Sequence, residues 1–316
     1  MQVRTVCVIG GSGFLGRNVV RHLAAREIFV RVPTRRRERA KGLILLPTVD
    51  VFNADVHDVK TLERLVAPVD AVINLVGILH QTRGETFERN HVELPRKIVA
   101  ACRETGVKRL VHVSALKAAF DAPSAYLRSK AEGESQIRAA QATGIQTTVL
   151  RPSVMFGRED RFLNLFARLA TLLPAIALAA PEARFQPVFV DDAARCLTEC
   201  LADAHTFGHS YDLCGPKVYS LRELVEYVCR TLGIRRPIIG LNQSLSLLLA
   251  TLMERLPRPM MTRDNVHSMR IDNVCEGVFP ELFGFPPTPL EAVVPEYLAG
   301  VTPRNRYRWF RYRARR

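Results

Sequence analysis

The sequence of 316 residues predicts an α/β fold, namely a doubly wound parallel sheet with a smaller C-terminal lobe. Three observations carry this prediction. Apolar β-branched runs alternate with helical periodicity up to residue 152, a glycine-rich turn joins the first run to the first helix, and prolines interrupt the pattern beyond residue 152. The alternation is typical of βαβ units, so the first half is expected to be a Rossmann-type domain.

The first five elements follow from local composition. Residues 3–10 are a short β-branched run, which predicts a buried strand, and residues 14–26 repeat apolar side chains at helical spacing. The runs 28–34 and 49–56 predict the second and third strands. Residues 62–67 then predict a short helix, as a crossover between parallel strands requires.

The next five elements continue the alternation. Residues 70–77 predict a strand, and 95–106 predict a helix that a glycine terminates. A strand is expected at 109–115, a long helix at 124–144 and a sixth strand at 145–152. Together these elements complete a parallel sheet.

Beyond residue 152 the pattern loosens. Strand-like pieces at 185–190 and 210–215 mix with helical segments at 191–203 and 220–233. We therefore divide the chain into three parts. They are a nucleotide-type domain of residues 1–152, a mixed lobe of 153–300 that completes the sheet and the substrate side, and a basic aromatic tail of 301–316.

The composition excludes several classes of protein. The formal net charge of +14 suggests an anionic partner, although a solubilising arginine-rich surface explains it equally well. Seven scattered cysteines without framework spacing predict reduced thiols and argue against secretion. Cys196 and Cys200 are interpreted as core residues, and no metal site is expected. The apolar stretches 169–181 and 245–253 are too short to span a membrane, and no targeting segment is recognised.

A glycine trio follows the first predicted strand and opens the first helix. Glycines at such positions permit a tight turn, close approach of the backbone to a pyrophosphate, and close packing of helix on strand. The helix N-terminus then supplies N–H groups for the phosphates. The alternative is a glycine-rich turn without a ligand. The predicted phosphate loop comprises Gly10, Gly13, Phe14, Leu15 and Gly16.

The residue after the second strand predicts which nucleotide binds. NAD sites place an acid there for the ribose 2′-hydroxyl, whereas this chain has Arg35, followed by two more arginines. A guanidinium pairs with a 2′-phosphate, so the predicted cofactor is NADP(H), an exposed basic turn being the alternative. Further cofactor contacts are expected at the ends of the third and fourth strands, from Asp55, Val56, Asn74 and Gly77.

Three residues form a candidate proton-transfer site. Tyr126 and Lys130 are four residues apart and share one face of the long predicted helix, and Ser114 ends the preceding strand. An ammonium group beside a phenol, together with a positive nicotinamide, lowers the pKa of the phenol. Ser114 could hydrogen-bond a substrate oxygen. The pair could equally persist for nucleotide binding alone.

These segments resemble the extended branch of the short-chain dehydrogenase/reductase superfamily. The resemblance covers about residues 3–230 and runs through "GGSGFLG", "ADV", "NLVG", "HVSA", "YLRSK", "LRPSVMFG" and "FVDDAA". Within it, "RPSVMFGREDRFLNLFARL" (151–169), "SAYLRSKAEGE" and "HVELPRKI" resemble the atypical group that contains the NADPH-binding alpha-subcomplex subunit 9 of respiratory complex I and its bacterial relatives.

The resemblance implies specific roles for matching residues. The glycine trio matches the pyrophosphate loop, Arg35 the 2′-phosphate position, Tyr126 and Lys130 the active-site pair, and Pro152 a position near the nicotinamide. Lys130 also matches a residue that bonds the nicotinamide ribose. His91 departs from the pattern, since it stands where active members usually carry asparagine, which puts complete proton-relay chemistry in question.

Two functions remain open on the sequence. The first is an NADP(H)-binding accessory or assembly protein of respiratory complex I or quinone metabolism. The second is an NADPH-dependent oxidoreductase, for instance a carbonyl or quinone reductase, dehydrogenase or epimerase, with Tyr126 as acid/base. The tail has seven arginines interleaved with aromatic residues, which suggests docking on a respiratory complex or an anionic membrane surface; nucleic acid is not expected. The expected location is the cytoplasm, and peripheral attachment to the inner face of the cytoplasmic membrane is compatible with it.

Overall fold

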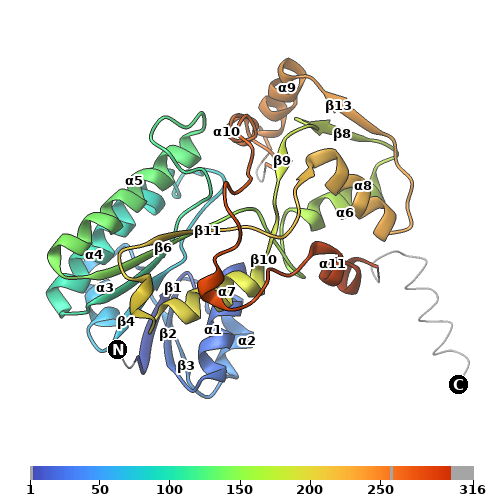
Figure 1. Cartoon of the computed structure of the whole chain (residues 1–316). Coiled ribbons are helices and arrows are strands. Elements are labelled where there is room, and N and C mark those ends of the chain that lie inside the picture. Colours follow the sequence, from blue (N-terminus) through green and yellow to red (C-terminus); the bar gives the residue numbers. More distant parts are fainter. Residues whose placement is uncertain (1–2, 257–258, 300–316) are drawn as a thin grey trace, which may run out of the picture. The chain divides into compact units, whose positions relative to one another are not determined.

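The computed structural model describes residues 3–256 and 259–299, and the chain forms two compact units (Figure 1). The first unit comprises residues 1–152, 190–213 and 280–285. The second comprises residues 153–189, 214–279 and the described residues from 286 onward. The chain therefore enters the first unit three times.

The predicted doubly wound parallel sheet is confirmed in the first unit. Its seven strands are all parallel and lie in the order β11-β6-β5-β4-β1-β2-β3. The order reverses between β1 and β4, and ligands of such sheets bind at the carboxyl ends of the strands beside this point. The strands are β1 (Thr5–Ile9), β2 (Phe29–Thr34), β3 (Val49–Asn53), β4 (Ala71–Asn74), β5 (Arg109–Val113), β6 (Gln146–Pro152) and β11 (Ser210–Leu213).

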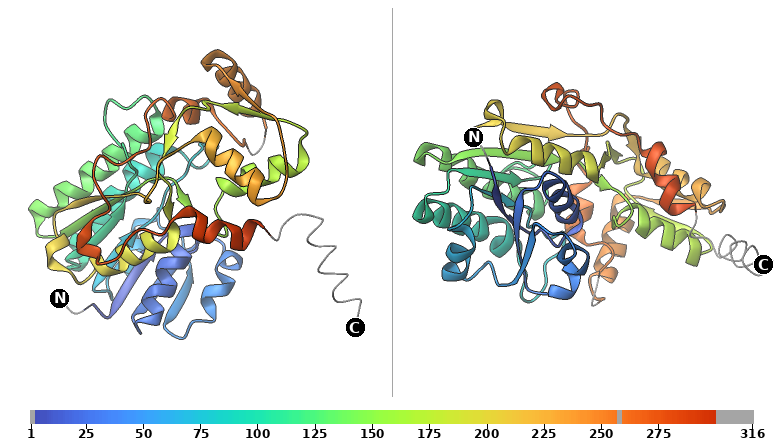
Figure 2. Two further views of the ribbon diagram at one scale, coloured as in Figure 1. Left: turned by 45° about the vertical axis from the view of Figure 1, so that its right-hand side comes forward. Right: turned by 90° about the horizontal axis from the view of Figure 1, so that it is seen from below.

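Helices cover both faces of this sheet. Three of them, α3, α4 and α5 (cyan to green), lie on one face, while α1 and α7 pack against each other on the opposite face (Figures 1 and 2). A short helix, α2, follows β2. The helices are α1 (Phe14–Ala25), α2 (Lys41–Ile44), α3 (Val59–Val66), α4 (Leu94–Thr105), α5 (Ala125–Ala139) and α7 (Val190–Cys200).

A buried apolar core fills the layer between the sheet and helices α3 to α5. Leu62 and Val66 of α3, Ile98 of α4 and Ile137 of α5 are fully buried against strand residues that include Leu110. Each such side chain stabilises the fold by about 1.5–3 kcal/mol relative to exposure. The helical periodicity read from the sequence therefore corresponds to this buried face.

Local signals place the helix ends. Asp58 caps α3 by accepting from the N–H of Thr61, and Ser124 caps α5 by accepting from the N–H of Leu127. Helix α4 stops at Gly106, whose φ of 76° is left-handed, as the glycine in the sequence predicts. The helix predicted at 124–144 is α-helical only to Ala139 and then tightens into a 3₁₀ turn, Ala140–Thr143.

One irregular element was not predicted. The chain forms a π-helical turn, Glu88–Glu93, which runs directly into α4. Its geometry depends on a glycine of the neighbouring helix, because a Cβ on Gly133 would lie 1.8 Å from the carbonyl oxygen of His91. Single π-turns within helices occur frequently at functional sites.

A buried arginine joins α7 to the sheet. The Arg109 guanidinium on β5 donates to the carbonyl oxygens of Leu201 and Gln146, at 3.2 and 2.9 Å, and to Thr148 Oγ1 at 2.8 Å. It also lies over the ring of Phe207. These bonds satisfy the charged group away from water and fasten the end of α7 next to β5 and β6.

The second unit is a mixed lobe with a core of its own. Helices α6, α8 and α11 bury Leu163, Leu224 and Val294 among one another. Three two-stranded sheets, β10-β7, β12-β9 and β13-β8, complete the unit. The helices are α6 (Leu163–Leu172), α8 (Leu221–Thr231), α9 (Gln243–Met253), α10 (Arg263–Ser268) and α11 (Leu290–Leu298). The strands are β7 (Met155–Phe156), β8 (Ile176–Ala179), β9 (Arg184–Phe185), β10 (Val188–Phe189), β12 (Tyr219–Ser220) and β13 (Ile238–Leu241).

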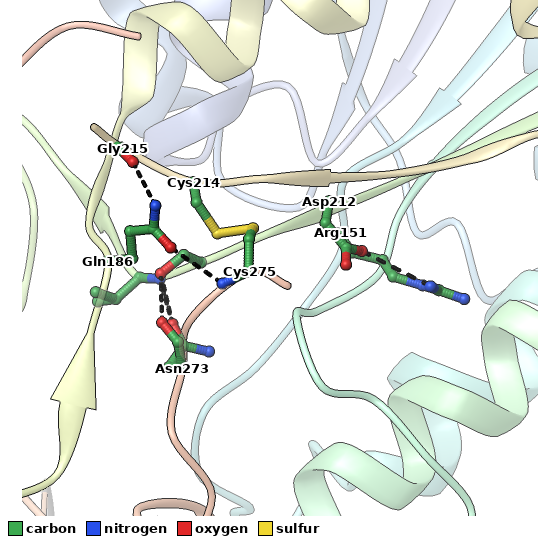
Figure 3. The surroundings of a disulfide bond; sticks show 9 residues. Arg151, Gln186, Asp212, Cys214, Gly215, Asn273 and Cys275 are labelled. Atoms are coloured by element: carbon green, nitrogen blue, oxygen red, sulfur yellow. Dashed lines mark hydrogen bonds and ion pairs between the residues drawn. A yellow bond between two sulfur atoms is a disulfide. The ribbon is translucent and has the colours of Figure 1, made fainter. Parts of the chain in front are cut away.

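The expectation that all cysteines are reduced is wrong for one pair. Cys214 and Cys275 form a disulfide within the second unit (Figure 3). Gln186 braces both sides of it, since its amide nitrogen donates to the carbonyl of Gly215 at 2.7 Å and its amide oxygen accepts from the N–H of Cys275 at 3.1 Å. The two cysteines are 61 positions apart, so no local spacing pattern could reveal the pairing.

The other five cysteines are free and buried, among them Cys196 and Cys200 on α7, as expected of core residues. Across residues 3–256 and 259–299, no helix has both the length and the apolar character needed to cross a membrane. The basic tail, 301–316, lies outside the described residues.

Candidate functional site

The glycine loop after β1 forms a cradle that only glycines permit. Gly10 has a φ of +87°, and a Cβ on Gly16 would lie 2.3 Å from the carbonyl oxygen of Gly10. Helix α1 begins at Phe14, and no side-chain hydrogen bond caps it at Gly13. The first-turn N–H groups of α1, which include those of Leu15 and Gly16, are therefore left without a capping side chain, which fits a pyrophosphate.

The end of β2 lies beside this loop. Ser12 Oγ and Thr34 Oγ1 are 3.2 Å apart, which ties the loop to the last residue of β2. The backbone N–H of Arg36 donates to the same Thr34 oxygen at 3.3 Å and forms a small turn. Arg35 follows at once and is exposed, and its guanidinium forms an ion pair with Glu85. The sequence did not reveal this partner.

The residues expected at the third strand lie in the segment between β3 and α3. Asp55 Oδ1 accepts from the N–H of His57 at 3.0 Å, and the carboxylate lies 3.7 Å from Arg89. Val56 is partly buried against the core under α3 and α4. Asp55 is therefore part of a charged edge beside β3, next to the residues that follow β2.

Asn74, at the end of β4, is wholly buried and makes two internal hydrogen bonds. Its Nδ2 donates to His112 Nδ1 at 3.1 Å, and its Oδ1 accepts from the N–H of Val76 at 3.2 Å. The side chain thus shapes the backbone as it leaves β4. Gly77 comes next, and a Cβ there would lie 3.9 Å from His91 Nε2.

Lys130 is buried at 4 % exposure and anchored to the sheet. Its Nζ donates to the carbonyl oxygen of Val113 on β5 at 2.7 Å. Burial lowers the pKa of this amine to about 8, and the nearby Glu134 carboxylate opposes that change. Glu134 itself is held by Arg151, whose Nε lies 3.1 and 3.0 Å from its two oxygens.

Tyr126 lies one turn before Lys130 on α5 and is half-buried. Its ring meets the rings of His91 and Phe87 edge to face, with centroids 5.6 and 5.9 Å away. Burial raises the pKa of the phenol to about 12, and the lowering expected beside a positive nicotinamide stays a prediction. The surroundings of the ring disfavour the charged phenolate.

Ser114 follows β5 and is also buried. Its backbone N–H donates to the carbonyl oxygen of Leu150 at 2.8 Å, but its Oγ has no hydrogen-bond partner among the described residues. A buried hydroxyl without a partner is uncommon and suits a group that meets a ligand oxygen. Pro152, at the end of β6, is buried nearby and accepts from the N–H of Leu116 at 3.1 Å.

His91 occupies the π-helical turn, and both of its ring nitrogens are engaged. Nε2 accepts from the backbone N–H of Ile78 at 3.0 Å, and Nδ1 lies 2.8 Å from Ser129 Oγ. The Ser129 hydroxyl donates its hydrogen to the carbonyl oxygen of Tyr126 at 2.8 Å. His91 Nδ1 must therefore donate to Ser129 Oγ. Burial, with Lys130 nearby, lowers the pKa of His91 to about 2. These contacts hold the imidazole in one neutral tautomer.

His112 is a buried site residue that the sequence reading missed, although it stands in the quoted "HVSA" segment. Its Nδ1 accepts from Asn74, so Nε2 carries the hydrogen, and this atom has no partner among the described residues. Burial holds the pKa of His112 well below its usual value, and the positive charge of Lys130 lowers it further. Three buried bases therefore lie within electrostatic reach of one another.

Comparison with known proteins agrees with this geometry. The model of the family described as NAD dependent epimerase/dehydratase matches residues 6–214. The chain is 35% identical over 318 residues to NADH dehydrogenase (ubiquinone) 1 alpha subcomplex subunit 9, mitochondrial, of Mus musculus, covering 96% of this chain and 81% of that protein. It is 29% identical over 276 residues to the NADH-ubiquinone oxidoreductase 40 kDa subunit of Neurospora crassa, covering 86% and 72%.

A solved structure shares the fold across nearly the whole chain. An NADPH-dependent quinone oxidoreductase of Escherichia coli, complexed with NADPH, superposes with a TM-score of 0.73 at 19% identity and covers 93% of this chain and 99% of its own. The resemblance drawn from the motifs is thereby confirmed at the level of family and fold.

Proposed function

Because the chain belongs to the NAD dependent epimerase/dehydratase family, we propose that it holds NADP(H) as a retained ligand while serving as an accessory or assembly protein of a quinone-linked NADH dehydrogenase. Two of its relatives carry the names of subunits of such enzymes. The expected location is cytoplasmic, peripheral to the membrane, with the tail of 301–316 reaching the complex or anionic lipid.

One observation carries the retained-ligand part of this proposal. The glycine cradle is intact, whereas His91, which stands where active members usually carry asparagine, has both ring nitrogens engaged by Ile78 and Ser129. Binding and turnover therefore separate in this site. The cradle can take a nucleotide whether or not the phenol reacts.

We assign the binding roles residue by residue. The pyrophosphate rests on the loop and the N-terminus of α1, a 2′-phosphate meets Arg35, and the adenosine edge meets Asp55 and Val56. Lys130 bonds the nicotinamide ribose. The proposed cofactor contacts are Gly10, Gly13, Phe14, Leu15, Gly16, Arg35, Asp55, Val56, Asn74, Gly77, Lys130 and Pro152.

The alternative function is reduction of a carbonyl or quinone, and the unpartnered Ser114 hydroxyl favours it. The nicotinamide of a nucleotide held by the cradle would supply a hydride. Ser114 would then donate to the substrate oxygen, and Tyr126 would transfer its phenolic proton to that oxygen as the negative charge develops. Lys130, anchored on the Val113 carbonyl, would stabilise the tyrosinate until solvent returned the proton.

A single series of titrations distinguishes the accessory role from the reductase activity. NADPH and NADH are titrated against the purified chain and its Arg35→Ala variant, and nicotinamide absorbance is then followed over hours with quinone and carbonyl substrates. NADPH that binds through Arg35 and stays reduced supports the accessory role. Oxidation that disappears in Tyr126→Phe supports the reductase. Failure of both nucleotides to bind would refute the proposal.

The partner is tested by affinity purification of the chain from detergent-solubilised membranes. Recovery of NADH dehydrogenase subunits with the wild-type chain, and their loss when residues 301–316 are deleted, is the expected result. Equal recovery without the tail would reassign the contact to the rest of the molecule. No recovery from either would refute the accessory role.

A further inference from the structure

The segment Thr82–Asn90, hereafter the strap, lies between β4 and α4 in the sequence and contacts residues that follow β2 and β3. It closes on itself through paired backbone bonds between Thr82 and Glu85, at 2.9 and 3.2 Å. Arg89 donates to the carbonyl oxygen of Gly84 at 2.9 Å and lies 3.7 Å from Asp55 after β3. The strap is thus an ordered loop with a charged contact at each neighbouring strand end.

Glu85 is the strap residue that reaches the end of β2. One of its carboxylate oxygens pairs with the Arg35 guanidinium, and the other accepts from Asn90 Nδ2 at 2.9 Å. Asn90 is buried at 3 % exposure, and its Nδ2 also donates to the carbonyl of Thr86 at 3.0 Å. The buried Asn90 amide therefore positions the Glu85 carboxylate on the side away from Arg35.

The charge state of Glu85 follows from these contacts. Burial opposes ionisation, but the hydrogen bonds from Arg35 and Asn90 win and lower the pKa of the carboxyl. Glu85 is then a carboxylate at neutral pH, held against the guanidinium that is proposed to receive a 2′-phosphate.

We infer that Glu85 is a specificity-determining residue that weakens the preference of this site for NADPH over NADH by holding Arg35 in an ion pair. The inference rests on the proposed nucleotide site and deepens it. A 2′-phosphate that approaches Arg35 meets this carboxylate whether or not the strap moves.

If the strap stays in place, the phosphate and the Glu85 carboxylate share one guanidinium, and two anions repel each other at close range. If the strap moves, the bonds of Glu85 to Arg35 and Asn90 must break first. NADH carries a hydroxyl in place of the phosphate and meets neither cost, because a carboxylate accepts a hydrogen bond from a ribose hydroxyl.

The test is a comparison of dissociation constants for NADPH and NADH by fluorescence titration of the full chain. Glu85→Gln keeps the shape and the bond to Asn90 but removes the charge. We expect NADPH to bind about ten-fold more tightly and NADH to change by less than about three-fold. Unchanged or weaker NADPH binding would overturn the inference.

Glu38→Gln is the matched control, since it removes the same charge from an exposed acid on the turn Arg37–Ala40, three residues from Arg35. An equal gain in both variants would show a general charge effect and would overturn the specific role of Glu85. A gain confined to Glu85→Gln supports it.

A second pair of variants guards against misfolding of the first. Arg35→Met leaves Glu85 facing the phosphate without its cation, so the double variant Arg35→Met with Glu85→Gln should bind NADPH more tightly than Arg35→Met alone. Tighter binding supports the inference, and equal or weaker binding contradicts it. If the wild-type chain binds neither nucleotide, the proposed function fails; if it binds NADPH and Glu85→Gln changes nothing, only this inference fails.

Discussion

Lys130→Met should remove a pH dependence of stability that the wild-type chain owes to one buried amine. The pKa of Lys130 is about 8 in the folded chain, against an ordinary value of 10.5. Between these values the unfolded chain holds a proton that the folded chain has released, so stability rises with pH. The whole difference corresponds to about 3 kcal/mol, of which about 2 kcal/mol falls between about pH 7 and about pH 9.5.

Urea unfolding followed by far-ultraviolet circular dichroism measures this difference at the two pH values. The free energy of unfolding of the wild type minus that of Lys130→Met should rise by about 2 kcal/mol on going to the higher pH. Arg128→Met, also on α5, is the control, because a guanidinium keeps its proton over this range and the variant should follow the wild type. Parallel pH dependences in the wild type and Lys130→Met would refute the reasoning.

Three further predictions concern the cradle, the locked imidazole and the disulfide. Gly16→Ala places a Cβ 2.3 Å from the Gly10 carbonyl oxygen, so nucleotide binding should be lost and stability should fall by more than about 2 kcal/mol in a thermal melt. His91 stays neutral in the folded chain, whereas it binds a proton in the unfolded chain below about pH 6.5. The free energy of unfolding of the wild type should therefore fall by about 2 kcal/mol more than that of His91→Gln between about pH 6.5 and 4.5. Reducing Cys214–Cys275, which closes a loop of 61 positions, should cost on the order of 4 kcal/mol in denaturant unfolding.

Each of these three has a control or a contrary outcome. Gly42→Ala, in a helical position with open space around its Cβ, should retain nucleotide binding. Equal acid sensitivity of the wild type and His91→Gln would contradict the assignment of a locked neutral ring. A variant with serine at both Cys214 and Cys275 should be indifferent to reductant, and a wild type that is equally indifferent would contradict the disulfide.

The sequence foretold those parts of the molecule that local chemistry determines. The alternation of strands and helices up to residue 152, the stop at Gly106 and the cradle from Gly10 to Gly16 depend on neighbouring residues along the chain, and each was found in place. Tyr126 and Lys130 share a face of α5 because a helix repeats every 3.6 residues.

The remaining parts depend on contacts between distant positions. Glu85 reaches Arg35 across 50 residues, and Asn74 reaches His112 across 38 because β4 and β5 are neighbours in register. The π-helical turn at His91 exists where Gly133 of another helix leaves room for a carbonyl. The sequence does not show which distant residue a polar side chain will contact. These three contacts could therefore be identified only from the structure.

The direction of the Tyr126 pKa shows the same limit in energetic terms. The helical spacing places Lys130 on the same face of α5 as the phenol, but it does not show how far the phenol is desolvated, and desolvation raises its pKa. Spacing carries no information about burial of one side chain by residues elsewhere in the chain.

Helix α7 and strand β11 belong to the first unit although they follow part of the second unit in the sequence, and this order affects folding during synthesis on the ribosome. Strand β6 is complete at Pro152, but its outer neighbour β11 ends only at Leu213, after part of the second unit has been made. Until then one edge of β6 has no neighbouring strand. The carbonyl oxygen of Leu201, which accepts from Arg109, has also not yet been synthesised. A nascent chain stalled near Pro152 is therefore a natural client for chaperones, and truncation at that residue should give an aggregating fragment despite an intact glycine loop.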